Sequence, residues 1–554
     1  MIRNYVSKLS SILGTNLTVF LILSVVIIVF FGRLTHTFYQ QDEWNAVGLI
    51  YSEGIEYIFP YSYDLADFIL VKGRMLSSLI FYLLSVYFPF QNTYLAILAI
   101  ILHIITSFLV FLLARLLVRN SLLAFLGALF FALNAVSHGA ITWSAIAISA
   151  AGSSILVLLS LLFFFKYLES SRQKFLLLTG FALYFSLWFK EAGLYLFLFF
   201  PVAALFFKKY TLKSYIQQFW WFLVPFFAIV GYRIIELRFG PPDPNLYISG
   251  ASDSFFLTIL IRLIIYPLTS FSLMFVPGQP FIEFAREVLR DNYKFFASSP
   301  NNLLISQSVI LDLLAVILTG FIVFVLALFS LKESRRNIKT VLFWLILTFV
   351  SFSPYVVLSK DFSYLESRYY YLPVASGAIL FSWLLLRIWA VSGRKLFFAV
   401  ALPLSLVFIF WHASAVKSAI EEQVVFSNWR TSFIKDLKST VPTLSGNKNV
   451  FYITGDRNYW ADGNRIPFQQ GSGYTLMVLY YTSGKIPKEF LKDGYLFDIG
   501  SQGYMEIGDL GFGYFWNKND LEKALINNNL SPDNVIPFYF DNAQHKLVKT
   551  KFIM

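Results

Sequence analysis

Long apolar runs, separated by short clusters of basic residues, dominate the sequence. Several of the runs reach the ~20 residues that a helix needs to cross a bilayer core. Eleven such runs lie at residues 14–32, 93–114, 121–136, 143–165, 175–189, 192–207, 216–237, 304–331, 340–358, 372–390 and 396–416. A mean hydropathy of +0.64 also lies outside the range of soluble globular chains. We therefore predict an α-helical polytopic membrane protein with eleven transmembrane helices.

Basic clusters between the runs predict how the chain is oriented. They comprise Arg115 and Arg119; Lys166, Arg172 and Lys174; Lys208, Lys209 and Lys213; Lys332, Arg335, Arg336 and Lys339; and Arg394 and Lys395. Because cytoplasmic loops are rich in Lys and Arg, we place all five clusters and the N-terminus inside. These loops account for the formal net charge of +12, and a nucleic-acid partner is not indicated. The first run reads as a retained signal anchor, and the lack of cysteine favours a bacterial plasma membrane.

Two further apolar stretches do not fit this alternation of sides. The stretch Met75 to Phe88 is short and interspersed with serines, so we predict an interfacial helix on the outer face. Residues 255–276 raise the same problem, and we predict either an interfacial or a re-entrant helix there.

The sequence changes character after residue 416. We predict short strands at "NVFYITG" (449–455), "YTLMVLYYTSG" (474–484) and "VIPFYFD" (535–541), each bounded by turn residues. The chain is therefore expected to form a transmembrane domain at 1–416 and a small extracytoplasmic α/β domain at 417–554.

Two adjacent carboxylates follow the first run, in "TFYQQDEWNAV" (37–47). Asp42 and Glu43 have an ordinary solvated loop as one explanation. The other is functional, since acids held at the membrane surface beside Trp44 can meet a lipid-linked substrate.

Other polar residues are predicted to emerge on the same outer side. Lys190 and Glu191 separate two apolar runs, where they form either a neutralised pair in a tight turn or part of a site. Glu366, Arg368 and Tyr369 lie in "ESRYYYLP" (366–373), typical of an interfacial aromatic belt. An Arg at headgroup depth is also well suited to grip a phosphate. His138 emerges on this side, whereas His103, within a run, is expected to be a hydrogen-bonded helix contact.

Motifs for nucleotide binding, thiol chemistry and zinc binding are missing from the sequence. The sequence has no cysteine, no GxxxxGK[ST] phosphate loop and no HExxH, and its five histidines show no metal-ligand spacing. A metal would therefore be a hard cation held by Asp and Glu oxygens.

Five segments in order resemble the C-type glycosyltransferase (GT-C) superfamily over roughly residues 10–410. They are "GRMLSSL" (73–79), "LAIILHIITSFLVFLLARLLVRN" (98–120), "LGALFFALNAVSHGAITW" (126–143), "LYFSLWFKEAG" (183–193) and "ESRYYYLP" (366–373). The pattern is similar to that of protein O-mannosyltransferases and of bacterial transferases that use polyprenyl-phosphate sugars.

This resemblance implies an inverting transfer of sugar from a polyprenyl-phosphate donor to a hydroxyl on a protein, glycan or lipid. Asp42 would be the general base, and Glu43 would orient either Asp42 or the acceptor. Arg368, with Arg74 or Lys190, would neutralise the donor phosphate. The remaining substrate-binding candidates are Glu366, Glu191, Tyr369, His138 and Trp44. No organic cofactor is implied, and a divalent cation, Mg²⁺ or Mn²⁺, on Asp42 and Glu43 stays open.

Two other classes of protein fit the composition. A transporter or flippase of lipid-linked sugars should show half-repeats or broken helices, for which we find no convincing case. A non-catalytic membrane scaffold that presents the outer domain would not explain the presence of Asp42 and Arg368.

Overall fold

The computed structural model describes residues 15–40, 42–59, 69–71, 73–239, 255–278, 280–284, 287, 300–331, 333–356, 365–444, 446–455, 468, 471–481, 486–491, 494–498, 500–541 and 543–552. The chain forms two compact units. We call Met1–Gly32, Tyr63–Ser77 and Leu98–Ser418 the helical unit, and Arg33–Ser62, Ser78–Ile97 and Ala419–Met554 the sheet unit.

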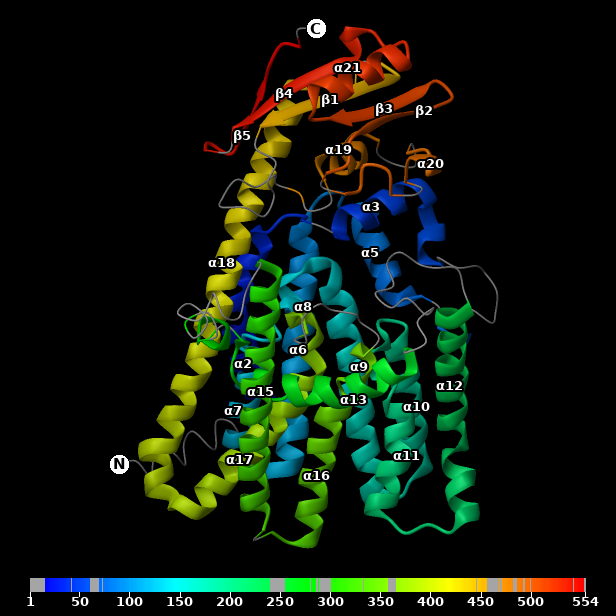
Figure 1. The fold of residues 1–554 in the computed structure, drawn as a ribbon. Coiled ribbons are helices and arrows are strands. Elements are labelled where there is room, and N and C mark those ends of the chain that lie inside the picture. Colours follow the sequence, from blue (N-terminus) through cyan, green and yellow to red (C-terminus); the bar gives the residue numbers. More distant parts are fainter. Residues whose placement is uncertain are drawn as a thin grey trace. The chain divides into compact units, whose positions relative to one another are not determined.

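Long α-helices make up the helical unit (Figure 1). They are α2 (Asn16–Phe31), α6 (Asn92–Val118), α7 (Ser121–Ala132), α8 (Gly139–Thr142), α9 (Ser144–Ser170), α10 (Gln173–Leu187), α11 (Leu196–Phe207), α12 (Leu212–Phe239), α13 (Phe255–Ser270), α15 (Pro300–Ser330), α16 (Arg335–Val350), α17 (Tyr371–Leu396) and α18 (Leu402–Thr440), with α6 and α18 continuing into the sheet unit. Within the described residues, eight helical stretches are long and apolar enough to cross a membrane. The predicted helical, multi-pass membrane protein is confirmed.

The helices differ from the eleven predicted spans in detail. Three of those spans, α7, α10 and α11, belong to apolar helices of only 10–17 residues. Gly393, with a φ of 72°, interrupts α17 near its C-terminal end, and the π-helical turn Phe397–Ala401 leads into α18. The chain reverses direction between the two helices (Figure 1). The stretch predicted to be interfacial or re-entrant contains Leu257–Met274, whose length and hydropathy suit a span. The predicted interfacial helix at residue 75 is the short helix α5 (Met75–Tyr87).

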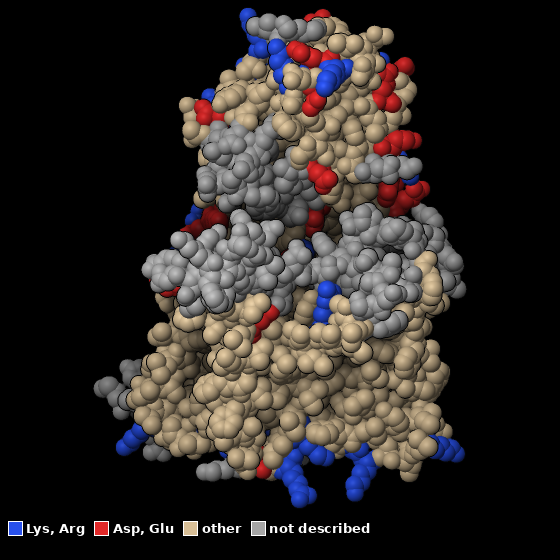
Figure 2. All heavy atoms as spheres, viewed as in Figure 1, with Lys and Arg blue, Asp and Glu red and all other residues tan. Residues whose placement is uncertain are grey.

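Figure 2 shows Lys and Arg side chains projecting from one end of the helical unit, below a broad uncharged band. The connections from α11 to α12 and from α15 to α16 lie at this end (Figure 1). This gathering of basic residues supports the expectation that this end faces the cytoplasm. The orientation itself stays a prediction.

The sheet unit contains a five-stranded sheet with strand order β2-β3-β1-β4-β5. The strands are β1 (Lys448–Gly455), β2 (Gly503–Ile507), β3 (Leu510–Phe515), β4 (Val535–Asp541) and β5 (Lys546–Lys549). The three central strands are parallel, and β2 and β5 pair antiparallel to them at the edges. Helix α21 (Lys518–Asn527) covers one face, where Phe515, Leu521 and Leu525 share a core.

Two predicted strands are confirmed as β1 and β4, whereas the strand predicted at 474–484 is wrong. Helix α19 (Ser472–Tyr480) occupies most of this stretch, and residues 482–484 lie outside the described residues. Gly473 packs against the ring of Tyr514. Because side chains alternate between the two faces of a strand, Tyr514 lies on the face of the sheet opposite Phe515. Every residue from Ser472 to Leu479 is buried, so the run carries no alternating pattern that distinguishes a strand from a buried helix.

Candidate functional site

Six charged side chains gather in the helical unit, and we call them the charge cluster: Arg74, Lys190, Glu191, Arg233, Glu366 and Arg368. They come from distant parts of the sequence. Arg74 directly precedes α5, and Lys190 and Glu191 lie in the turn between α10 and α11. Arg233 lies near the end of α12, and Arg368 lies in the short 3₁₀ helix η6 (Ser367–Tyr369). Five of the six were predicted site residues.

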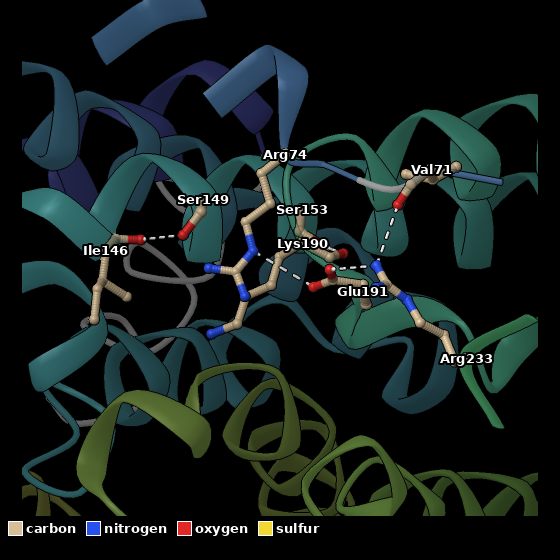
Figure 3. Close-up of polar contacts among 8 residues, drawn as sticks. All are labelled: Val71, Arg74, Ile146, Ser149, Ser153, Lys190, Glu191 and Arg233. Carbon is tan, nitrogen blue, oxygen red and sulfur yellow. Dashed lines mark hydrogen bonds and ion pairs between the residues drawn. The ribbon is translucent and has the colours of Figure 1, made fainter. Parts of the chain in front are cut away.

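Glu191 connects two arginines of the charge cluster (Figure 3). Its carboxylate oxygens lie 3.4 Å from Arg74 Nε and 3.7 Å from Arg233 Nη2. Arg233 also donates to the backbone carbonyl of Val71 at 3.5 Å. Burial opposes ionisation of Glu191, but the charges of Arg74, Arg233 and Lys190 outweigh it and hold the pKa of Glu191 below its usual value. Glu191 is therefore ionised and already engaged.

Lys190 is the most enclosed cation of the cluster, at 7% exposure. Its backbone carbonyl accepts a hydrogen bond from Ser153 Oγ at 3.0 Å, which fixes the turn. Its Nζ lies 5.3 Å from the centre of the Tyr369 ring and has no hydrogen bond or ion pair with any other described residue. Figure 3 shows its side chain extending alongside that of Arg74. Burial, with repulsion from Arg74 and Arg368, lowers the pKa of Lys190 to about 7.

Arg368 is held between aromatic rings. Its guanidinium carbon lies 4.8 Å from the Trp143 ring centre and 5.0 Å from that of Tyr369. The Tyr369 ring in turn contacts that of Tyr355 at 4.7 Å. Nε of Arg368 lies 2.7 Å from a Glu366 carboxylate oxygen, as an ion pair whose angle does not suit a hydrogen bond. The two rings and the carboxylate together restrict the plane of the guanidinium.

Close packing between α8 and η6 places Arg368. A Cβ on Gly139 would overlap Ser367 Oγ and lie 3.4 Å from the backbone nitrogen of Arg368. A larger residue at this position would require the Ser367 side chain to move. The adjacent His138 lies with Nδ1 3.3 Å from Thr142 Oγ1, and burial lowers its pKa to about 4. His138 is therefore neutral near pH 7 and adds no charge to the cluster.

The charge cluster has more positive than negative charge. Among the described residues it contains three arginines, Lys190 and two carboxylates, and both carboxylates form ion pairs with its arginines. Positive charge in a partly buried place is unfavourable unless an anion accompanies it. The arrangement is therefore suited to bind an anion such as a phosphate, which Arg recognises through paired hydrogen bonds.

The predicted acids Asp42 and Glu43 belong to the sheet unit, where they begin helix α3 (Asp42–Glu53). Glu43 is only 2% exposed, and its Oε2 accepts a hydrogen bond from the backbone N–H of Gln40 at 3.2 Å. This contact fixes the entry into the helix, as in a capping box. Burial, and then the charge of Glu43, raise the pKa of Tyr39 above its usual value. Asp42 is less buried than Glu43.

Trp44 is completely buried in an aromatic group of the sheet unit. Its ring centre lies 5.6 Å from both Phe90 and Phe468 and 5.7 Å from Tyr39. In this structure Trp44 packs in a protein core and holds the first turn of α3.

The structure shows three neighbours of the predicted residues that sequence reasoning missed: Trp143, Arg233 and Tyr355. Arg233 carried a signal, because an ionisable residue inside an apolar run is a functional candidate. The two aromatic residues carried none, since such residues are frequent throughout the chain. His103 is a structural contact as expected, with Nδ1 2.8 Å from Tyr371 Oη and Nε2 2.9 Å from the Ala132 carbonyl.

Asp42 and Glu43 do not form a complete metal site with other side chains that the structure describes. Across the described ranges, no three His, Asp or Glu side chains come together in a way that could hold a metal ion. Glu43 is committed to the backbone of Gln40. We therefore assign no step to a metal.

Comparison with protein-family models and with curated proteins found no match. A search of solved structures found similarity to the crystal structure of the Archaeoglobus fulgidus oligosaccharyltransferase complex with Zn and sulfate. The identity is 14% and the TM-score 0.40, over 84% of this chain and 61% of that chain. The chain thus spans less than two thirds of that protein's length.

Proposed function

We propose that this protein is a membrane glycosyltransferase that moves a sugar from a polyprenyl-phosphate donor to a hydroxyl acceptor. The observation that carries the proposal is the positive excess of the charge cluster, enclosed by aromatic rings in a membrane protein. A polyprenyl phosphate matches it, since its phosphate supplies the anion and its chain suits an apolar surrounding. The family resemblance of the sequence points to the same donor.

In the proposed reaction, the oxygen of the acceptor hydroxyl attacks C1 of the sugar. The bond between C1 and the phosphate oxygen breaks, and its electron pair stays on the phosphate. Asp42 takes the proton of the hydroxyl, and Glu43 orients Asp42. The departing polyprenyl phosphate gains negative charge, which Arg368, Arg74 and Lys190 stabilise. Attack from the face opposite the phosphate inverts the configuration at C1.

The roles of the remaining candidates follow from their places in the helical unit. Glu191 holds Arg74 and Arg233 in position, and Glu366 does the same for Arg368. Tyr369 offers its ring to two cations and an aromatic edge to a substrate.

The test uses purified protein with radiolabelled polyprenyl-phosphate sugars and measures loss of sugar from the lipid. Asp42→Asn retains the side-chain volume but cannot take the proton, so it should lower single-turnover transfer about 10²–10⁴-fold with donor affinity close to normal. Glu43→Gln should be milder. Full turnover in both variants would contradict the proposal and favour movement of an intact lipid-linked sugar across the membrane.

We further propose that the N-terminus faces the cytoplasm and the C-terminus the outside. A C-terminal reporter that is active only in the cytoplasm should be silent. Activity of that reporter would place the charge cluster on the opposite side from the one proposed.

A further inference from the structure

We propose that helix α19 of the sheet unit positions Asp42, through a contact between Tyr474 and the helix that begins at Asp42. This inference rests on the proposed role of Asp42 as the general base. It assigns a task in the reaction to the C-terminal part of the chain. The residues concerned all belong to the sheet unit.

Helices α3 and α19 are in close contact at Gly48. Gly48 of α3 faces α19, and a Cβ at this position would lie 2.5 Å from Tyr474 Oη and 3.0 Å from Val478 Cγ2. Glycine is not required by the backbone, since Gly48 lies inside a helix without positive φ. An alanine would favour the isolated helix by about 1 kcal/mol. The glycine is therefore explained by the closeness of Tyr474.

A hydrogen bond also joins the two helices. Tyr474 Oη donates to Asn45 Oδ1 at 3.3 Å. Asn45 and Gly48 lie one turn apart on the same side of α3, and Asp42 lies one further turn toward the N-terminus. A shift or rotation of the helix at Asn45 and Gly48 is therefore passed to Asp42.

Tyr474 is itself rigidly supported. It is 2% exposed, and its ring meets that of Phe497 edge-on at 5.2 Å. The neighbouring Gly473 packs on Tyr514 of β3. The path from the sheet to the first turn of α3 thus consists of close contacts between ordered groups.

Two variants test this inference, each with a matched control. Tyr474→Phe loses only the hydroxyl and should reduce single-turnover transfer about fivefold. Gly48→Ala displaces the helix and should reduce it about 10- to 100-fold, because small misplacements of a reacting group are costly. Tyr480→Phe removes another α19 hydroxyl, which donates to the Val441 carbonyl at 2.6 Å, and should have little effect. Gly320→Ala, on a helix with open space around it, controls for the change of residue type.

The decisive readout is a double-mutant cycle with Asp42→Asn. A positioning residue acts through Asp42, so Gly48→Ala and Tyr474→Phe should have no further effect on the residual rate of Asp42→Asn. Donor affinity should be unchanged in both single variants. If either change slows the wild type and the Asp42→Asn variant by the same factor, the contact is merely structural and the inference fails. Wild-type rates in both single variants, with Asp42→Asn inactive, would overturn the inference but keep the proposed function. Full activity of Asp42→Asn would overturn both.

Discussion

Two lysines flank helix α11, and their surroundings are opposite. At the C-terminal end, Lys208 Nζ donates to the Tyr167 carbonyl at 3.1 Å and to Ser171 Oγ at 2.8 Å. On the N-terminal side, Lys190 Nζ contacts the face of Tyr369 and lies near the charges of Arg74 and Arg368.

The comparison separates two uses of positive charge in one unit. Other cations of the helical unit are also locally satisfied, since Lys339 Nζ donates to the Phe206 carbonyl at 2.7 Å and Arg387 pairs with Glu333. Such cations suffice to orient a membrane protein without any ligand. The charge cluster around Lys190 instead gathers more positive charge than its carboxylates balance. The proposed polyprenyl-phosphate donor would supply an anion to match it.

The largest expected effect is that of Arg368→Ala. Loss of an enclosed, charge-assisted phosphate contact should weaken donor binding by about 2–4 kcal/mol, or roughly 30- to 1000-fold in Kd. Arg368→Lys should recover only part of this, because an ammonium lacks the planar fork. Lys208→Ala is the matched change at the other end and should leave donor affinity near normal. Equal donor affinities for wild type and Arg368→Ala would contradict a role in phosphate binding and favour the other explanation, that Arg368 belongs to an interfacial aromatic belt.

The pH dependence of donor binding should depend on Lys190. With a pKa of about 7, Lys190 is protonated below this pH and loses its charge above it. The donor phosphodiester keeps its negative charge throughout, so Kd should increase as pH rises from about 7 toward about 9. Uptake of one proton limits the slope to about tenfold per pH unit. Titration calorimetry across this range is the measurement. Lys190→Met should bind more weakly and without this slope, and a flat wild-type profile would contradict the assignment.

A smaller effect is expected where no charge is changed. Gly139→Ala places a Cβ against the side chain of Ser367, which must move, next to the backbone nitrogen of Arg368. Donor affinity should fall about fivefold, equivalent to about 1 kcal/mol. Gly320→Ala, which meets open space, should not change it. If the Gly139 variant folds and binds donor normally, the packing of α8 on η6 does not set the position of Arg368.

The sequence predicted the helical membrane architecture because long apolar runs are a strong and local signal. Lys190, Glu191 and Arg368, which the sequence marked as charges beside apolar runs, and Arg74, which the family resemblance suggested, lie together in the structure. Arg233 could have been found by the same rule. Trp143 and Tyr355 could not, because their importance arises from contacts between segments far apart in the chain. The strand predicted at 474–484 was wrong because a fully buried run has no periodicity that distinguishes a strand from a helix. The contact of Tyr474 with α3 could therefore not be predicted either.

The most direct test of the account is a comparison of two lipids that differ only in the phosphate. Binding of polyprenyl phosphate and of the polyprenyl alcohol of equal chain length is measured on the purified wild type and on Arg74→Ala/Arg368→Ala. If the charge cluster binds the phosphate, the wild type should strongly prefer the phosphate, and the double variant should lose this preference while still binding the alcohol. Equal wild-type affinity for the two lipids, or a preference unchanged in the double variant, would contradict it.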